Sequence, residues 1–182
     1  MSYVDFTKQE FQEIAYKKAM SKGYVTLNER RMFSENTSAT SIFLSHSHYD
    51  KALIAQAKTF LENLGIPIYV DWADETMPEK TNGITAQKIK RQIYKNDKFV
   101  LLATNNAITS KWCNWEVGIG DTYKPLSRKI ALFLLAENSG VWNGNEYLQI
   151  YPRIEKNPFN NDKYYIRYPD GTFEDLLIWL NK

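Results

Sequence analysis

Short apolar runs alternate with segments of helical periodicity over most of the chain, and this alternation limits the fold more than any other feature. The apolar runs cover residues 42–44, 66–70, 98–103 and 129–136, and helical patterns lie between or beyond them. Strands that alternate with helices are typical of βαβ units, in which a parallel sheet is covered on both faces. The sequence therefore predicts an α/β fold with helices on both faces of a mostly parallel sheet of about five strands.

The first forty residues lie outside this alternation. Apolar residues recur at helical spacing over residues 5–20, which predicts an amphipathic helix ending near Gly23. The segment 34–41 is small and polar, which indicates a linker. We therefore expect an N-terminal helical arm and linker over residues 1–40 and a main domain over residues 41–182.

The last part of the chain is predicted to be less regular. Residues 137–163 are rich in Asn, Gly and Pro, which indicates a long connection with short helical pieces at most. Residues 164–168 are expected to form a final strand, followed by a turn. A last helix is expected to begin at a Thr172 cap and to bury one stripe of side chains: Phe173, Leu176, Leu177 and Leu180.

Charge and composition argue against several classes of partner. The chain has 23 Lys plus Arg against 21 Asp plus Glu, and a net charge of +2 gives no electrostatic reason to bind nucleic acid or a membrane. No apolar run approaches the roughly 20 residues that span a bilayer, and the N-terminus lacks the layout of a signal peptide. We therefore expect a cytoplasmic protein with no nucleic acid or membrane partner.

Polar residues follow the predicted strands at one edge of the sheet. The first strand leads into Ser45, His46 and Ser47, the second ends at Asp71-Trp72, and the third at Thr104-Asn105. Ligands of parallel α/β sheets bind outside the carboxyl ends of the strands. These segments are expected to meet there.

The helix after residue 110 places an acidic residue on its apolar side. Ser110 is a good N-cap, and Glu116 then lies one turn after Trp112 with mostly apolar or small neighbours. Burying an unpaired carboxylate is expensive, so Glu116 is expected to be paired with a nearby Lys or Arg, protonated, or part of a cleft that a ligand completes.

Other candidate residues have plain structural interpretations. His46 and His48 are the only histidines, and we favour capping and cleft-lining roles over a metal site. Cys113, the only cysteine, is expected to be a small buried hydrophobe rather than a nucleophile. Trp115 is expected to pack in the core, and Asp71 either takes part in chemistry or holds the following loop.

The helix over residues 51–64 has well-marked ends. Ser47 and Asp50 have the spacing of a capping box with Asp in place of Glu, and Gly65 follows at the position of a left-handed C-terminal residue.

Three motifs in this order resemble the Toll/interleukin-1 receptor (TIR) domain family, and in particular its bacterial single-domain members. Residues 41–50 resemble the family's first box, and 68–71 its second strand, with the long loop after it. Ser110-Lys111-Trp112-Cys113-Asn114-Trp115-Glu116 resembles the Ser-x-Trp-Cys-x-x-Glu motif, which carries the catalytic glutamate in enzymatic members. The resemblance covers residues 41–182 and implies a flavodoxin-like three-layer fold.

The resemblance implies an NAD-cleaving enzyme with Glu116 as its catalytic residue. The expected reaction breaks the nicotinamide–ribose bond of NAD and gives ADP-ribose or a cyclic or conjugated form of it. NAD is then the substrate, and no cofactor or metal is expected. The substrate is expected to contact a set of residues at the edge described above: Ser45, His46, Ser47, Asp71, Trp72 and Trp112.

The sequence departs from the family pattern at two places. His46-Ser47-His48 stands where many members carry an aromatic and a basic residue, and Thr85 lies where several enzymatic members carry a stacking aromatic residue. Two rival functions remain open: a non-catalytic scaffold that acts by self-association, and an enzyme like the nucleoside glycosyltransferases. For the NAD-cleaving enzyme we expect a role in antiphage defence, an active homo-oligomer and a downstream effector that senses the product.

Overall fold

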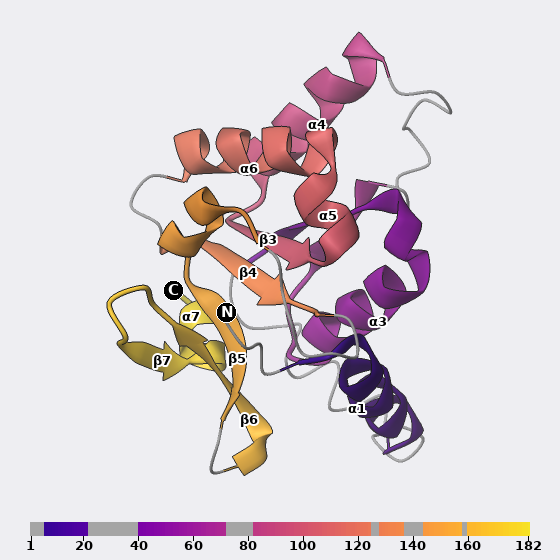
Figure 1. Ribbon diagram of the computed structural model, residues 1–182, viewed down its shortest axis with the longest axis vertical. Helices are drawn as coiled ribbons and strands as arrows, with labels where there is room; N and C mark the ends of the chain where they lie inside the picture. Colours follow the sequence, from indigo (N-terminus) through magenta and orange to yellow (C-terminus); the bar gives the residue numbers. More distant parts are fainter. Residues whose placement is uncertain (1–5, 22–39, 72–81, 125–127, 137–143, 158–159) are drawn as a thin grey trace.

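A seven-stranded sheet runs through the middle of the computed structural model, which describes residues 6–21, 40–71, 82–124, 128–136, 144–157 and 160–182 (Figure 1). The strand order is β2-β1-β3-β4-β5-β6-β7. The strands are β1 Ile42–Ser45, β2 Ile68–Tyr69, β3 Lys98–Ala103, β4 Ile130–Leu134, β5 Arg153–Asn157, β6 Asn160–Arg167 and β7 Phe173–Asp175.

Five neighbouring strands, from β2 to β5, pair in parallel, and β6 and β7 extend the sheet as antiparallel strands. The helices are α1 Lys8–Ser21, α3 Lys51–Glu62, α4 Gly83–Lys95, α5 Asn105–Thr109, α6 Lys111–Tyr123 and α7 Leu176–Leu180, with short 3₁₀ turns η2 His48–Asp50 and η4 Glu146–Ile150. The predicted three-layer α/β fold with a mostly parallel sheet is confirmed.

Each face of the sheet buries its own apolar cluster. Side chains of α1, α3 and α7 pack on one face, where Phe60, Phe133 and Trp179 are buried. Side chains of α4, α5 and α6 pack on the other, where Phe43, Phe99 and Val117 are buried. Because both faces are covered, β3 and β4 are buried along their whole length, and both are apolar except for Lys98 at the start of β3.

The N-terminal helix packs into this core. Thr7 and Glu10 form a reciprocal cap, in which each side chain accepts a hydrogen bond from the backbone N–H of the other. Phe6 and Phe11 are almost fully buried, and both rings pack edge-to-face on Phe133. The backbone of α1 is also joined to the end of β4, where Lys8 donates to the Ala136 carbonyl at 2.9 Å. The predicted linker 34–41 lies outside the described residues except for its last two.

The C-terminal part differs from the prediction in two respects. The expected long connection 137–163 contains β5 and the start of β6. The sequence does not reveal β5, because Ile154 is the only apolar residue of Arg153–Asn157, although Glu155 is buried as well. The last helix begins after Asp175, whose carboxylate accepts from the Leu177 N–H, and not after Thr172. Phe173 therefore lies in β7 and is exposed, as is Leu177, while Trp179 is buried.

None of the helices in the described part of the chain combines the length and the apolar composition that a membrane crossing requires.

Candidate active site

The strand order changes direction at β1, which has β2 on one side and β3 on the other. From β1 the chain continues to β2 on one side of it and then crosses to β3 on the other side. Such a switch point opens a crevice at the carboxyl ends of the strands. Ser45 ends β1, Asp71 follows β2, and Thr104 follows β3, as the sequence predicted.

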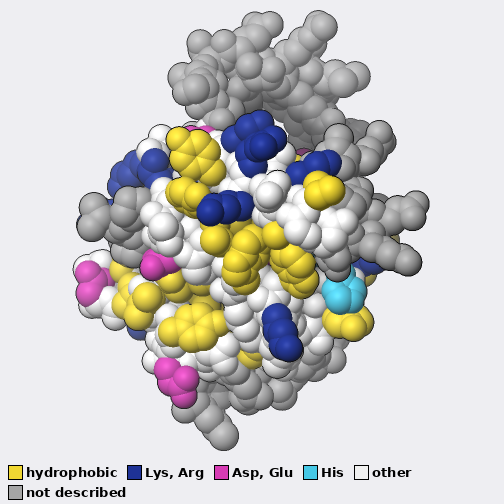
Figure 2. All heavy atoms as spheres, turned by 90° about the horizontal axis from the view of Figure 1, so that it is seen from above, with side chains coloured by type: hydrophobic (Ala, Val, Ile, Leu, Met, Phe, Trp, Pro, Cys, Tyr) yellow, Lys and Arg dark blue, Asp and Glu magenta, His cyan; other side chains and the backbone are white. Residues whose placement is uncertain are grey.

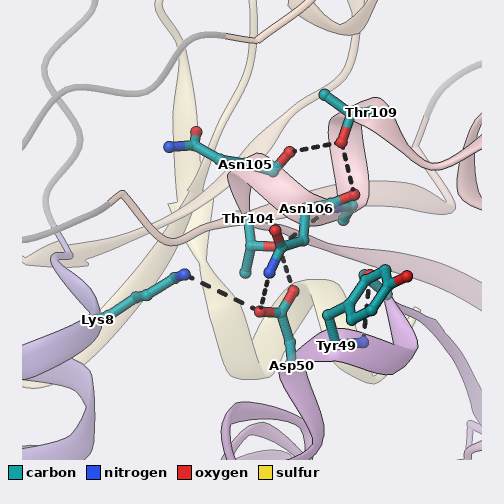
Figure 3. A network of polar contacts seen from close by, with 9 residues as sticks. Lys8, Tyr49, Asp50, Thr104, Asn105, Asn106 and Thr109 are labelled. Atoms are coloured by element: carbon teal, nitrogen blue, oxygen red, sulfur yellow. Dashed lines mark hydrogen bonds and ion pairs between the residues drawn. The ribbon is translucent and has the colours of Figure 1, made fainter.

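A polar network joins the two turns that leave β1 and β3. The Asp50 carboxylate accepts hydrogen bonds from the Thr104 hydroxyl and from Asn106 Nδ2, and the Lys8 ammonium lies 3.9 Å away (Figure 3). The capping box expected from Ser47 and Asp50 does not form, because Asp50 makes these long-range bonds instead of capping α3. The Ser47 hydroxyl accepts from the Tyr49 N–H, at 3.4 Å, while the Asp50 N–H donates to the Ser47 carbonyl at 2.9 Å. The network fixes one side of the crevice.

Helix α6 begins at the predicted residue and packs closely on the sheet. The Ser110 hydroxyl caps it by accepting from the Cys113 N–H at 3.3 Å. A Cβ atom on Gly120 would lie 3.1 Å from the Phe99 ring, so a side chain here would push α6 away from β3. Glu116 lies one turn before Gly120 on the same helix. Because α6 lies this close to the sheet, the side chain of Glu116 is held against the sheet as well.

Glu116 reaches the end of β1. It is 4% exposed, and its Oε2 accepts a hydrogen bond of 2.6 Å from the Ser45 hydroxyl, which is buried too. Within the described ranges, no Lys or Arg forms an ion pair with Glu116. The salt-bridge explanation of this carboxylate is therefore wrong for the described part of the chain.

Burial changes the protonation of Glu116. Loss of hydration raises its pKa from 4.5 to about 8, the Ser45 hydrogen bond opposes the rise, and the charge of Asp71 adds to it. The carboxyl group is therefore largely protonated at neutral pH in the unliganded protein. A cation placed next to Glu116 would favour the ionised form and lower this pKa.

His46 lies behind Asp71. Its Nδ1 is 2.9 Å from the Leu44 carbonyl and its Nε2 is 3.2 Å from Asp71 Oδ1, while its side chain is only 5% exposed. His48 is exposed and its ring packs on Tyr49, so the two imidazoles have different partners. Among the described residues, no group of three or more His, Cys, Asp or Glu side chains is arranged to hold a metal ion.

A surface pocket of about 340 Å³ lies where the first turns of α4 and α6 meet. It is lined by Ala86, Lys111, Trp112 and Trp115. Trp112 is 36% and Trp115 37% exposed, so the core packing expected for Trp115 is wrong. Trp72, which was also predicted to bind substrate, lies outside the described residues.

Cys113 has the structural role that the sequence indicated. The thiol is buried, and burial followed by the nearby charge of Glu116 raises its pKa to about 12. It is therefore not a nucleophile at neutral pH. The sequence interpretation did not place Trp115 or Lys111 at this pocket. Two features of the sequence pointed to them: Trp115 is a second tryptophan on the flank of the helix, and Lys111 is a lysine in its first turn.

Comparisons with known proteins agree on the family. Residues 42–162 match the profile of the family described as TIR domain. The chain is 28% identical over 186 residues to the "Probable 3' cyclic ADP-D-ribose synthase ThsB'" of Bacillus cereus (strain MSX-D12), a match that covers 90% of this chain and 95% of the relative. It is 27% identical over 86 residues to the "Putative cyclic ADP-D-ribose synthase TIR2" of Cytobacillus dafuensis, covering 46% of this chain and 23% of that protein.

One solved structure, a prokaryotic SEFIR domain, superposes with a TM-score of 0.46 at 12% identity, covering 68% of this chain and 85% of that one.

Proposed function

The chain belongs to the TIR domain family, and on that basis we propose that it cleaves the nicotinamide–ribose bond of NAD with Glu116 as the catalytic carboxylate. The observation that carries this proposal is the buried Glu116, bonded to Ser45 at the carboxyl edge of the sheet with no described cationic partner. A carboxyl group in this position contributes nothing to stability that would explain it, since burial disfavours its ionised form.

The chemistry of NAD suits a site with one such carboxylate. Glycosidases normally use two carboxyl groups, one of which protonates the leaving group. The nicotinamide ring of NAD is already cationic and leaves as a neutral molecule when the bond to C1′ breaks and its electron pair moves to the ring nitrogen. No general acid is needed, and the ionised Glu116 stabilises the positive charge that develops on the ribose.

The neighbouring residues have distinct parts in this proposal. Ser45 donates to Glu116 Oε2 and keeps the carboxylate oriented toward the ribose. Asp71, 32% exposed, adds negative charge on the side from which a cationic ring enters. His46 has a buried side chain next to Asp71, so in this proposal it acts on the substrate through Asp71. Trp112 supplies an exposed ring at the mouth of the site.

The product depends on which nucleophile takes the C1′ carbon. Water gives ADP-ribose, whereas a nucleophile on the adenosine half gives a cyclic ADP-ribose, and in either case the attacking group releases a proton. The two relatives are named as cyclic ADP-D-ribose synthases, which supports cyclisation in this chain as well. We extend the proposal to a cytoplasmic antiphage role, an active homo-oligomer, and an effector that senses the cyclic product.

The test is incubation of the purified protein with NAD, followed by chromatography and mass spectrometry of the products. Glu116→Gln should reduce turnover by about 100-fold or more, because it removes the charge that stabilises the transition state. Glu155→Gln serves as the matched control, since Glu155 is a buried glutamate on β5, and it should retain activity. Equal turnover by wild type and Glu116→Gln would refute the role of Glu116.

The rival functions give different results in the same assay. A non-catalytic scaffold would leave NAD intact at every protein concentration, including concentrations at which the protein self-associates. An enzyme like the nucleoside glycosyltransferases would cleave or exchange the base of simple nucleosides, so a nucleoside panel run beside NAD separates it. The buried carboxyl group favours an enzyme, because self-association gives no reason to bury Glu116.

A further inference from the structure

Helices α4 and α6 present an exposed aromatic face. Trp112 and Trp115 lie at the start of α6, and Tyr94 and Tyr123 lie at the far ends of the two helices. The view from above the molecule shows hydrophobic side chains gathered on this end between lysine and arginine side chains (Figure 2). The tryptophan pair lines the pocket between the first turns of α4 and α6.

The tryptophan pair has the geometry of a base-binding site. The ring centroids are 5.4 Å apart and the planes are perpendicular, so one ring can stack on a planar ligand while the other bounds its edge. Ala86 leaves room on the α4 side, and Lys111 lines the same pocket. No described carboxylate pairs with the Lys111 ammonium.

We propose that this pocket binds the adenine base of the dinucleotide, with Trp115 as its stacking residue and Lys111 beside the adjoining phosphate. The proposal rests on the proposed function and assigns the half of NAD that Glu116 does not hold. It makes Trp115 and Lys111 determinants of affinity and of substrate choice.

Charge decides which half of NAD enters the pocket. The nicotinamide ring is cationic, and Lys111 would repel it, whereas adenine is neutral and its ribose carries an anionic phosphate. Glu116 and Asp71 do not line this pocket, and the negative charge that they can carry suits the cationic ring. The two halves of the ligand therefore match the two ends of the site in charge.

Size and spacing agree with this assignment. The pocket is largely open to solvent and measures about 340 Å³, near the lower end of the range of about 300 to 1,000 Å³ that is usual for small-molecule pockets, so it has room for one base with its ribose. Lys111 precedes Glu116 by five residues on the same helix, which corresponds to roughly 7.5 Å along the helix axis and about 140° around it. A dinucleotide that joins the two sites would therefore bend around the first turns of α6.

The experiment compares Trp115→Leu with Tyr123→Leu as the matched control. Both aromatic residues are on α6 and both are 37% exposed, but Tyr123 lies at the opposite end of the helix under Lys90. Binding of adenosine monophosphate and of nicotinamide mononucleotide is measured by calorimetry on the full chain. Turnover of NAD by each variant separates effects on KM from effects on kcat.

Stacking of a base on an aromatic side chain is worth about 1 to 3 kcal/mol, or roughly 5- to 150-fold in affinity. Because Trp115 is only partly enclosed, Trp115→Leu should weaken adenosine monophosphate binding by about 5- to 20-fold and raise the KM for NAD by a similar factor with little change in kcat. Lys111→Gln should weaken the binding of adenosine monophosphate but not the binding of adenosine, which has no phosphate. Tyr123→Leu should match the wild type.

Three results would overturn the proposal: no binding of adenosine monophosphate to the wild type, binding that Trp115→Leu leaves unchanged, or an equal loss of nicotinamide mononucleotide binding in that variant. A change in oligomeric state with nucleotide binding intact would assign the pocket to a protein interface instead, and would also overturn it. Adenosine monophosphate binding by Glu116→Gln should be normal. Failure of this proposal is thus separate from failure of the catalytic role of Glu116.

Discussion

Replacing Glu116 by Gln should stabilise the protein, and the gain should grow with pH. Gln has the shape of a protonated Glu and can accept the Ser45 hydrogen bond, but it cannot ionise. The pKa of Glu116 is raised from 4.5 to about 8, so above pH 4.5 the unfolded chain releases a proton that the folded protein keeps. Folding stability of the wild type therefore falls as pH rises from 4.5 to about 8 and is constant beyond it. Glu116→Gln lacks this loss.

The size of the effect follows from the pKa difference. Each pKa unit corresponds to about 1.4 kcal/mol, so the stabilisation at pH 9 is about 3 to 5 kcal/mol, against almost nothing near pH 4.5. For a chain of this length, 1 kcal/mol shifts Tm by roughly 2 to 4 °C. We expect Glu116→Gln to melt roughly 6 to 20 °C above the wild type at pH 9.

The assay is thermal unfolding followed by circular dichroism from pH 4.5 to 9.5, with both proteins in the same buffers. Other titrating groups are common to both proteins and cancel in the difference. Ser45→Ala is the complementary variant: it removes the hydrogen bond that holds the pKa of Glu116 down, so the fall in its stability should continue to higher pH and be larger in total than that of the wild type. Parallel Tm curves for Glu116→Gln and wild type across this range would refute a buried, protonated Glu116.

Two further predictions concern the same helix and its surroundings. Asp71→Asn removes a negative charge that raises the pKa of Glu116, so the rising limb of kcat/KM against pH should move to lower pH; an unmoved limb would separate Asp71 from Glu116. Gly118→Ala, which meets no atom within 4 Å, should add about 0.5 to 1 kcal/mol to the unfolding free energy. Gly120→Ala meets the Phe99 ring at 3.1 Å and should instead lower both stability and turnover; a gain in unfolding free energy equal to that of Gly118→Ala would contradict the close packing of α6.

The features that sequence predicted well are set by local chemistry. The Ser110 cap and the period of the following residues placed Glu116 on the buried side of α6, because both depend only on neighbours in the chain. The strand-end rule brought Ser45, Asp71 and Thr104 to one edge, because the direction of parallel strands follows from their order. These inferences needed no knowledge of side-chain packing.

The features that the sequence did not predict depend on which parts of the chain pack against them. Four of the five residues of β5 are polar or charged, so their pattern resembles a loop, although the strand pairs with β4 and β6. Trp115 was expected to be buried, but no described element covers that flank of α6 except the first turn of α4, where Ala86 is too small to enclose it. The bonds of Asp50 to Thr104 and Asn106 span more than 50 residues, and local capping statistics do not include such partners.

The burial of Glu116 links the stability of the protein, the protonation of this carboxyl group and the binding of the proposed substrate. Without a ligand the site holds a neutral carboxyl group, because an uncompensated charge there is costly. Under the proposed function, a bound nicotinamide ring would bring a positive charge, lower the pKa of Glu116 and displace its proton. At neutral pH the carboxylate would then be ionised mainly when the substrate is bound. Burial therefore has two effects: it removes the hydration that would stabilise the free carboxylate, and it strengthens the attraction that the carboxylate would exert on a cationic ring. Glu116→Gln removes both effects at once.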